Sequence, residues 1–224
     1  MKREATMNTL TAAPMALLIE RLYARANATT SDVFSTMAAD ERERLMRSKA
    51  DYRELYGLLK DLWLPVSRDT GKLLYMLARS AKARSIVEFG TSFGLSTLHL
   101  AAALRDNGGG VLITSEFEAS KIALAREHLI EGGVSDLVDI REGDALVTLA
   151  TDLPDVVDLL LLDGAKALYR DVLSLVESRL KPGAVVVADN TDYCPDYLAY
   201  VRSPKNGYPS VPVGEDVELS VRLS

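Results

Sequence analysis

The fold of this chain can be predicted from the pattern that begins in the stretch Val87-Glu88-Phe89-Gly90-Thr91-Ser92-Phe93-Gly94-Leu95-Ser96. This stretch ends a short apolar run at Ser85–Phe89, turns at Gly90 and enters the helical pattern of Leu95–Leu104. Gly90 permits a sharp turn, and Gly94 permits a close approach to a ligand where the helix begins. A strand, a glycine turn and a helix in this order predict the first βα unit of a parallel sheet.

Short apolar runs alternate with helical patterns through the rest of the chain. The later runs are Val111–Ser115, Val138–Ile140, Val157–Leu162 and Ala184–Ala188, and the helical patterns between them are Ala119–Ile130 and Ala167–Leu180. Near-continuous apolar runs are typical of strands buried on both faces. Val211–Leu223, with Gly214-Glu215-Asp216 at its centre, predicts a closing antiparallel hairpin. The order predicts a doubly wound α/β sandwich with right-handed crossovers.

The first third of the chain has a different pattern. Apolar residues recur at helical spacing in Met15–Tyr23 and Leu45–Leu59, with a helix start predicted at Thr30-Ser31-Asp32. We therefore expect a helical extension over residues 1–63 and a main domain over residues 64–224, joined as one globular unit. The apolar faces of the extension predict packing on the main domain or a homodimer through these helices. A structural cap and a substrate lid both remain open.

Composition excludes several classes of protein. The 224 residues include 26 Lys and Arg and 32 Asp and Glu, a formal net charge of −6. Without a basic run the chain is a poor partner for nucleic acid. No apolar stretch approaches the roughly 20 residues that span a bilayer, and Glu4 argues against a signal peptide, so we expect no membrane partner and a cytoplasmic location. A single cysteine, Cys194, excludes an intrachain disulfide and a cysteine-rich zinc site.

Polar residues follow the first three predicted strands, where ligands bind in such sheets. Ser92 stands where a dinucleotide-binding turn has a glycine, so the turn suits a ligand without a diphosphate. Glu116 follows the second strand and is placed to accept ribose hydroxyls, and Asp144-Ala145 follows the third and could pair with an adenine edge. Together they indicate an adenosine-bearing ligand. A purely structural turn, and an acidic helix start at Glu116, are the alternatives.

Oxygen donors follow the fourth and fifth strands. Asp163 ends one run, and Asp189 and Asn190 end the next, so a parallel sheet would bring them together. Such donors select Mg²⁺, with Mn²⁺ or Ca²⁺ as alternatives, unless Asp189 and Asn190 simply begin a turn. Beside a cation the pKa of Lys166 would fall toward that of a general base. A salt bridge to Asp163 is the other interpretation of Lys166.

These separated motifs, in this order, resemble the metal-dependent class I S-adenosylmethionine O-methyltransferases of the catechol and caffeoyl-CoA type. The likeness runs from about Leu64 to the C-terminus. It implies a Rossmann-like, doubly wound, seven-stranded, mostly parallel sheet with a C-terminal antiparallel hairpin, here with extra N-terminal helices. It also implies S-adenosyl-L-methionine and Mg²⁺ as cofactors and a small phenolic molecule with vicinal oxygens as methyl acceptor.

The resemblance assigns a role to each matching residue. Those that would bind the cofactor are Val66, Glu88, Gly90, Ser96, Glu116, Asp144, Ala145 and Asp163. Within this set, Glu88 and Ser96 would serve the methionine end, while Val66 and Gly90 would make backbone contacts. The residues that would hold the metal are Asp163, Asp189 and Asn190, and Lys166 would be the catalytic lysine.

Two features bear on the branch of the family and on rival functions. Cys194-Pro195 with Tyr197–Arg202 resembles the catechol branch, but the segment 203–210 lacks the acidic residue that those enzymes carry before the final hairpin. Tyr56 and Lys60 have the Tyr-x-x-x-Lys spacing of one class of NAD(P)-dependent dehydrogenase, although they precede the glycine turn. A dehydrogenase and a non-catalytic protein that binds an adenosyl ligand therefore remain as alternatives.

Overall fold

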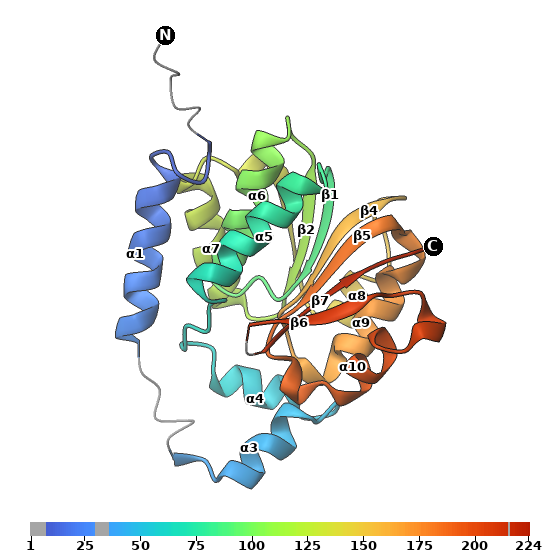
Figure 1. The fold of residues 1–224 in the computed structure, drawn as a ribbon. Helices are drawn as coiled ribbons and strands as arrows, with labels where there is room; N and C mark the ends of the chain where they lie inside the picture. The colour runs from blue at the N-terminus through green and yellow to red at the C-terminus, as the bar shows by residue number, and fades with distance from the viewer. Residues whose placement is uncertain (1–7, 30–35, 215) are drawn as a thin grey trace.

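The computed structural model describes residues 8–29, 36–214 and 216–224 (Figure 1). The strands are β1 (Ser85–Phe89), β2 (Val111–Glu116), β3 (Val138–Glu142), β4 (Val157–Leu162), β5 (Leu180–Ala188), β6 (Ser210–Val213) and β7 (Val217–Val221). The helices are α1 (Met15–Ala28), α3 (Ala39–Met46), α4 (Tyr52–Leu58), α5 (Arg68–Ser80), α6 (Leu95–Asp106), α7 (Ala119–Glu131), α8 (Ala145–Thr148), α9 (Tyr169–Val176) and α10 (Pro195–Val201). The predicted helix start at residues 30–32 and Glu215 of the hairpin turn lie outside the described residues.

The strands form a seven-stranded sheet in the order β3-β2-β1-β4-β5-β7-β6. The five strands from β3 to β5 run parallel, and β7 adds to β5 in the antiparallel direction, with β6 beyond it. The strand order reverses between β1 and β4, so the carboxyl ends of these strands flank the crevice where such sheets bind ligands. The predicted doubly wound, Rossmann-like fold with its closing hairpin is confirmed.

Helices cover both faces of the sheet (Figure 1). Alternate residues of each buried strand point to opposite faces, so Ile86 packs with Leu74 of α5 and Leu100 of α6. Val87 points the other way, into the core that contains Val172 of α9. Strands β1 and β4 are buried at every position, as expected from their continuous apolar runs, whereas β3 is only partly buried because it forms one edge of the sheet.

The segment before β5 differs from the prediction. We expected one helix over Ala167–Leu180, but α9 ends at Val176, a short 3₁₀ helix follows it, and β5 already begins at Leu180. Leu180 pairs with Val157, and the register between β4 and β5 shifts before Leu159 pairs with Val185. Leu180, the last residue of the predicted helix, is therefore part of the sheet because it pairs with β4.

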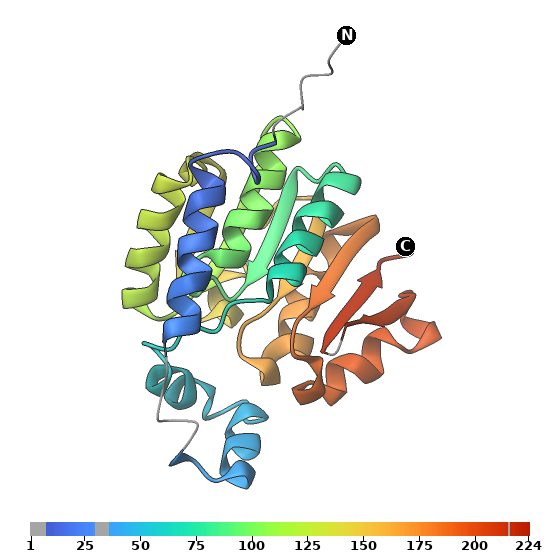
Figure 2. The same cartoon turned by 60° about the vertical axis from the view of Figure 1, so that its left-hand side comes forward.

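The N-terminal helices lie at two places on the main domain. Helix α1 covers α6 and α7 on one side of the sandwich, where Leu18 and Leu22 join a core with Leu98 (Figure 2). Helices α3 and α4 lie beyond the carboxyl ends of the parallel strands (Figure 1). The division at residues 63 and 64 and the homodimer stay predictions. No helix among the described residues is both long and apolar enough to cross a membrane.

Candidate functional site

The β1–α6 turn is shaped by its protein neighbours. Gly90 has a φ of +104°, and a Cβ there would lie 2.5 Å from the carbonyl oxygen of Asp163. Gly94 has a φ of +87°, and a Cβ there would lie 3.6 Å from Ala125 of α7. Gly94 therefore also allows α6 to begin close to α7, and its expected approach to a ligand stays a prediction. Ser92 also adopts the left-handed region, with φ of 47°, so it turns the chain as a glycine would.

Glu116 at the end of β2 binds this turn. Its Oε2 accepts the backbone N–H of Ser92 at 2.9 Å, while its Oε1 accepts those of Phe117 and Glu118 at 3.0 and 3.1 Å. The carboxylate predicted to contact a ribose thus also fixes the loop that connects β1 to α6. Its position at the end of β2 places it on the wall of the cavity described below.

Glu88 lies inside the protein rather than on the surface of the turn. Its side chain is fully buried, and its two oxygens accept hydrogen bonds from Ser96 at 2.6 Å and Thr97 at 2.7 Å. Burial raises the pKa of Glu88 to about 7, although the three hydroxyl groups around it oppose this shift. Glu88 therefore positions Ser96, which with the buried Val66 lines a small cavity beside Trp63.

Asp144 connects the β3–α8 turn to the N-terminal extension. Its side chain caps α8 and also accepts a hydrogen bond of 2.9 Å from Tyr52 of α4. The same carboxylate forms an ion pair with Arg53, the next residue of α4. Hydrogen bonds from the first turn of α8, then from Arg53 and Tyr52, lower the pKa of Asp144 despite the opposing effect of burial. Ala145 is buried beside it. The predicted adenine turn is therefore held against α4.

Three cavities meet around these residues. Cavity A has a volume of about 60 Å³ and is lined by Tyr52, Arg53, Tyr56, Phe89, Gly90, Ser115, Glu116, Phe117, Glu118, Lys121, Gly143, Asp144, Ala145, Asp163, Gly164, Ala165 and Leu168. Cavity B has a volume of about 240 Å³ and is lined by Met46, Tyr56, Leu59, Leu64, Ser92, Lys121, Asp163, Gly164, Lys166, Asn190 and Tyr193. Cavity C, of about 10 Å³, is lined by Trp63, Leu64, Pro65, Val66, Ser92, Phe93, Leu95, Ser96 and Asp163. Asp163 lines all three.

The strand ends bring Asp163, Asp189 and Lys166 together as predicted. The backbone N–H of Asp163 donates to Phe89, and that of Asp189 donates to Leu162, which aligns the ends of β1, β4 and β5. Lys166 Nζ lies 3.0 Å from Asp163 Oδ1, so the salt bridge that we considered for this lysine is present.

Tyr169 connects the lysine to the end of β5. Lys166 Nζ donates to Tyr169 Oη at 2.8 Å, and Tyr169 Oη donates to the carbonyl of Asp189 at 2.8 Å. Tyr169 is fully buried, and burial raises the pKa of its hydroxyl well above the ordinary value. The lysine is thereby held in one position by a carboxylate and a protonated phenol.

The donor set around Asp163 fits a hard cation. Burial is the main cause that raises the pKa of Asp163 and of Asp189, and for Asp189 the charge of Asp163 adds to it. Asn190 donates its amide nitrogen to Asp216 at 2.8 Å, which leaves its amide oxygen as the remaining donor atom. Among the described residues no group of three or more His, Cys, Asp and Glu side chains is suited to a metal. The set here has two carboxylates and one amide, all oxygen donors, which is the chemistry that Mg²⁺ prefers.

The pKa of Lys166 is shifted in the direction opposite to that expected beside a cation. Burial lowers it, but the charge of Asp163, followed by those of Tyr56 and Asp189, outweighs burial, so the pKa is raised overall. The expected lowering depended on a cation next to the ammonium, whereas here the nearest charges are carboxylates. Lys166 thus acts as the partner of Asp163 in this structure.

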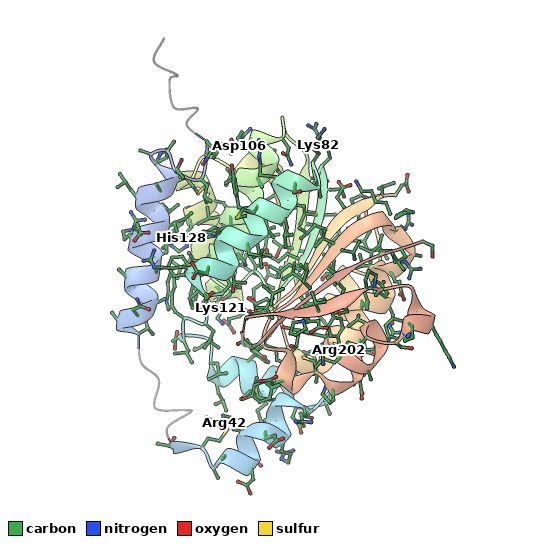
Figure 3. The ribbon with its side chains drawn as sticks, viewed as in Figure 1. Arg42, Lys82, Asp106, Lys121, His128 and Arg202 are labelled. Carbon is green, nitrogen blue, oxygen red and sulfur yellow. The ribbon has the colours of Figure 1, made fainter. Side chains whose placement is uncertain are left out.

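Sequence reasoning missed several residues that line the cavities. Tyr52 and Tyr56 of α4, Lys121 of α7 and Tyr193 all contribute to cavities A or B. Tyr52 and Tyr56 are four residues apart and so share one helix face, and Lys121 comes five residues after Glu116. Both spacings were available as signals. Figure 3 places Lys121 toward the end of the sheet that faces α4, and Lys82 and Asp106 at the opposite end.

The Tyr56–Lys60 spacing does not form a catalytic pair. Tyr56 lines cavities A and B, and its hydroxyl donates to the carbonyl of Gly164 at 3.4 Å. Helix α4 ends at Leu58, and Lys60 is exposed beyond it. Cys194 is also structural, because it is buried, donates to the carbonyl of Lys166 at 3.3 Å, and has a pKa raised by burial to about 12.

Comparison with known proteins agrees with this geometry. Residues 87–191, which run from β1 to the loop after β5, match the family described as "Methyltransferase domain". The chain is 34% identical over 130 residues to the catechol O-methyltransferase of Niastella koreensis, covering 57% of this chain and 58% of the relative. Over this region the chain is therefore similar to O-methyltransferases. It is also 34% identical to the catechol O-methyltransferase of Mycobacterium tuberculosis, over 57% of this chain and 57% of that relative. The chain thus spans less than three-fifths of the length of these two curated relatives.

Solved structures of methyltransferases share the fold. The O-methyltransferase TomG from Streptomyces achromogenes, in complex with S-adenosylmethionine (SAM), is 28% identical with a TM-score of 0.65, over 84% of this chain and 92% of TomG. An O-methyltransferase from Bacillus cereus in complex with S-adenosylhomocysteine (SAH) is 19% identical with a TM-score of 0.67, over 95% of this chain and 94% of that one. The second likeness supports the fold alone.

Proposed function

We propose that the protein transfers the methyl group of SAM to a hydroxyl of a small phenolic molecule with vicinal oxygens, with the help of a divalent cation. The observation that carries the proposal is the meeting of cavities A, B and C at Asp163. One carboxylate therefore borders the space for an adenosine, the space for an acceptor, and the pocket of Val66 and Ser96.

The residues around cavities A and C support SAM as the methyl donor. Glu116 and Asp144 lie at the ends of β2 and β3, and Ser96 and Val66 line cavity C. TomG was solved in complex with SAM. When bound, SAM supplies an electrophilic methyl group on a sulfonium. The chain's own contribution is to orient it between the β1 turn and α4.

The oxygen donors of Asp163, Asp189 and Asn190 would hold the cation. Mg²⁺ bound there would lower the pKa of a coordinated hydroxyl and orient vicinal oxygens. Cavity B borders Asp163 and Asn190, and its lining includes the apolar side chains of Met46, Leu59 and Leu64. A polar end and an apolar body suit a phenolic ring. Exclusion of water by these apolar side chains strengthens the electrostatic interactions around the reacting atoms.

Lys166 would take and move the acceptor's proton once a cation bound at Asp163 offsets the carboxylate charges that raise the pKa of the lysine. Its Nζ lies at cavity B, fixed by Asp163 and by Tyr169 Oη. A general base has to lie within hydrogen-bond reach of the proton that it takes, and a lysine between these two partners is positioned before the acceptor arrives. Tyr169 thereby acts as a positioning residue.

The test is methyl transfer from labelled SAM to 4-methylcatechol, with Mg²⁺ or with excess EDTA. We expect a methyl ether with Mg²⁺ and none with EDTA. Transfer that persists in EDTA would contradict the cation. No transfer despite SAM binding by calorimetry would contradict the acceptor class, and no SAM binding would contradict the whole proposal.

Asp189→Asn tests the proposed cation site directly, with Asp192→Asn as its matched control. It removes one carboxylate from the donor set, so the Mg²⁺ concentration that gives half-maximal rate should rise by about tenfold or more. Asp192→Asn makes the same change at an exposed position three residues away and should leave that concentration unchanged. Equal effects of the two variants would remove Asp189 from the cation site.

A further inference from the structure

Lys121 is a buried lysine at the junction of two cavities. It lies in the first turn of α7, and only 5% of the residue is exposed. Its side chain lines both cavity A and cavity B, together with Tyr56, Asp163 and Gly164. The resemblance to the family assigned no role to this position.

The ammonium group of Lys121 has no hydrogen bond or ion pair with any residue that the structure describes. Its Nζ lies 5.4 Å from the centroid of the Phe93 ring. Glu116 uses its oxygens on the backbone of the β1 turn and of its own loop, and Glu118 caps α7 through Ser120. Burial lowers the pKa of Lys121, and the charges of four carboxylates oppose this only in part; these are Glu116, Glu118, Asp61 and Asp163.

An unpaired buried ammonium is costly, because it loses the hydration that it has in water. Lys166, the other lysine of cavity B, is compensated by Asp163 at 3.0 Å. Lys121 is therefore the lysine of this cavity whose charge a ligand would have to compensate. The group that does so has to be an anion small enough for cavity B, of about 240 Å³.

Two ligands could bring that anion, and the arrangement of the cavities distinguishes them. Val66 and Ser96, to which the resemblance assigns the methionine end of the cofactor, line cavity C, and Lys121 does not. On the cofactor side Lys121 shares cavity A with Glu116 and Asp144, which are assigned to the uncharged ribose and adenine. The carboxylate of the methionine end would thus lie away from Lys121. The methyl acceptor is then the ligand that supplies the anion paired with Lys121.

We propose that Lys121 binds a carboxylate on the methyl acceptor and so selects aromatic acids with vicinal oxygens over uncharged catechols. This rests on the proposed function, because it concerns the acceptor of that same reaction. Oxygen atoms of the acceptor would face Asp163 and Asn190, while its carboxylate would pair with Lys121 across cavity B. Such a charge-assisted hydrogen bond in a water-poor cavity is strong and depends on the position of the charge.

The test compares 2,3- and 3,4-dihydroxybenzoate with catechol and 4-methylcatechol. Binding is measured by calorimetry with Mg²⁺ and SAH present, and turnover with Mg²⁺ and SAM. Lys121→Met keeps the apolar stem and removes the charge, and Lys121→Arg keeps the charge. Lys72→Met is the control, since Lys72 is an exposed lysine on α5.

We expect the wild type to prefer a dihydroxybenzoate, and Lys121→Met to weaken its binding about tenfold, the equivalent of about 1.4 kcal/mol. Binding of 4-methylcatechol and of SAM should be unchanged, Lys121→Arg should restore part of the preference, and Lys72→Met should have no effect. Equal losses for charged and uncharged acceptors in Lys121→Met would overturn the proposal. So would weaker SAM binding with an unchanged acceptor preference, which would assign Lys121 to the cofactor. A wild type that binds and methylates none of the four compounds would instead overturn the proposed function.

Discussion

Tyr52 of α4 donates a hydrogen bond of 2.9 Å to Asp144, which lies 92 residues later at the start of α8. Arg53 pairs with the same carboxylate. These contacts hold the N-terminal extension over cavity A, whose volume of about 60 Å³ is smaller than an adenosine requires. We therefore expect α4 to move when a nucleoside enters cavity A.

Tyr52→Phe should speed cofactor entry. It removes one hydrogen bond that holds α4 closed, worth ~0.5–1.5 kcal/mol, so the association rate constant of SAH should rise by roughly two- to tenfold. Stopped-flow fluorescence measures this rate. Tyr200→Phe, which breaks a similar bond to Glu177 on another part of the molecule, is the control and should leave the rate unchanged. An unaltered rate in Tyr52→Phe would show that α4 does not limit entry.

Gly90→Ala should destabilise the protein by more than Gly109→Ala. Both glycines have a φ near +100°, of 104° and 101°, but a Cβ at Gly90 would clash with Asp163 whereas one at Gly109 meets nothing within 4 Å. Backbone strain alone costs about 1–2 kcal/mol. Urea unfolding of both variants measures the difference, which we attribute to the clash. Equal losses would mean that the end of β4 can shift to make room.

Glu88 should make stability depend on pH. Burial raises its pKa to about 7 from the ordinary 4.5, so between these values the folded protein holds a proton that the unfolded chain releases. The contribution of Glu88 to the free energy of unfolding therefore falls as pH rises from about 4.5 to 7 and stays low above that.

Glu88→Gln cannot ionise, so its stability relative to the wild type should improve by about 3 kcal/mol between about pH 4 and pH 8. Urea unfolding at both pH values measures this change. Glu127→Gln, at an exposed position on α7, is the control. A difference between Glu88→Gln and the wild type that does not vary with pH would contradict the buried, protonated carboxyl.

Lys166→Met should lower kcat for methyl transfer by about 10²–10⁴-fold, because it removes the group that would take the acceptor's proton. The Kd of SAM should change by less than about twofold, since Lys166 is not among the described residues lining cavities A and C. Lys60→Met, at an exposed lysine, serves as the comparison. An undiminished kcat would remove Lys166 from the reaction.

The sheet and the positions of the site residues at its edge could be predicted from local pattern. The run Ser85–Phe89 with Gly90 fixes a strand followed by a turn, and four later runs repeat this pattern. Because parallel strands end at one edge, Glu116, Asp163 and Asp189 were expected at the same edge of the sheet. The limits of some elements were wrong, as where pairing of Leu180 with Val157 overrode the helical pattern, and helices α5, α8 and α10 were not predicted.

Contacts between distant segments were decided only by the tertiary structure. Whether Glu88 faces the cofactor or a buried pair of hydroxyls, whether Tyr52 reaches Asp144, and whether Lys121 finds a partner depend on packing. Spacing along the chain sets which residues share a strand end or a helix face. It does not set which of these side chains become buried away from water. Burial is the main cause of the raised pKa of Glu88 and of the lowered pKa of Lys121.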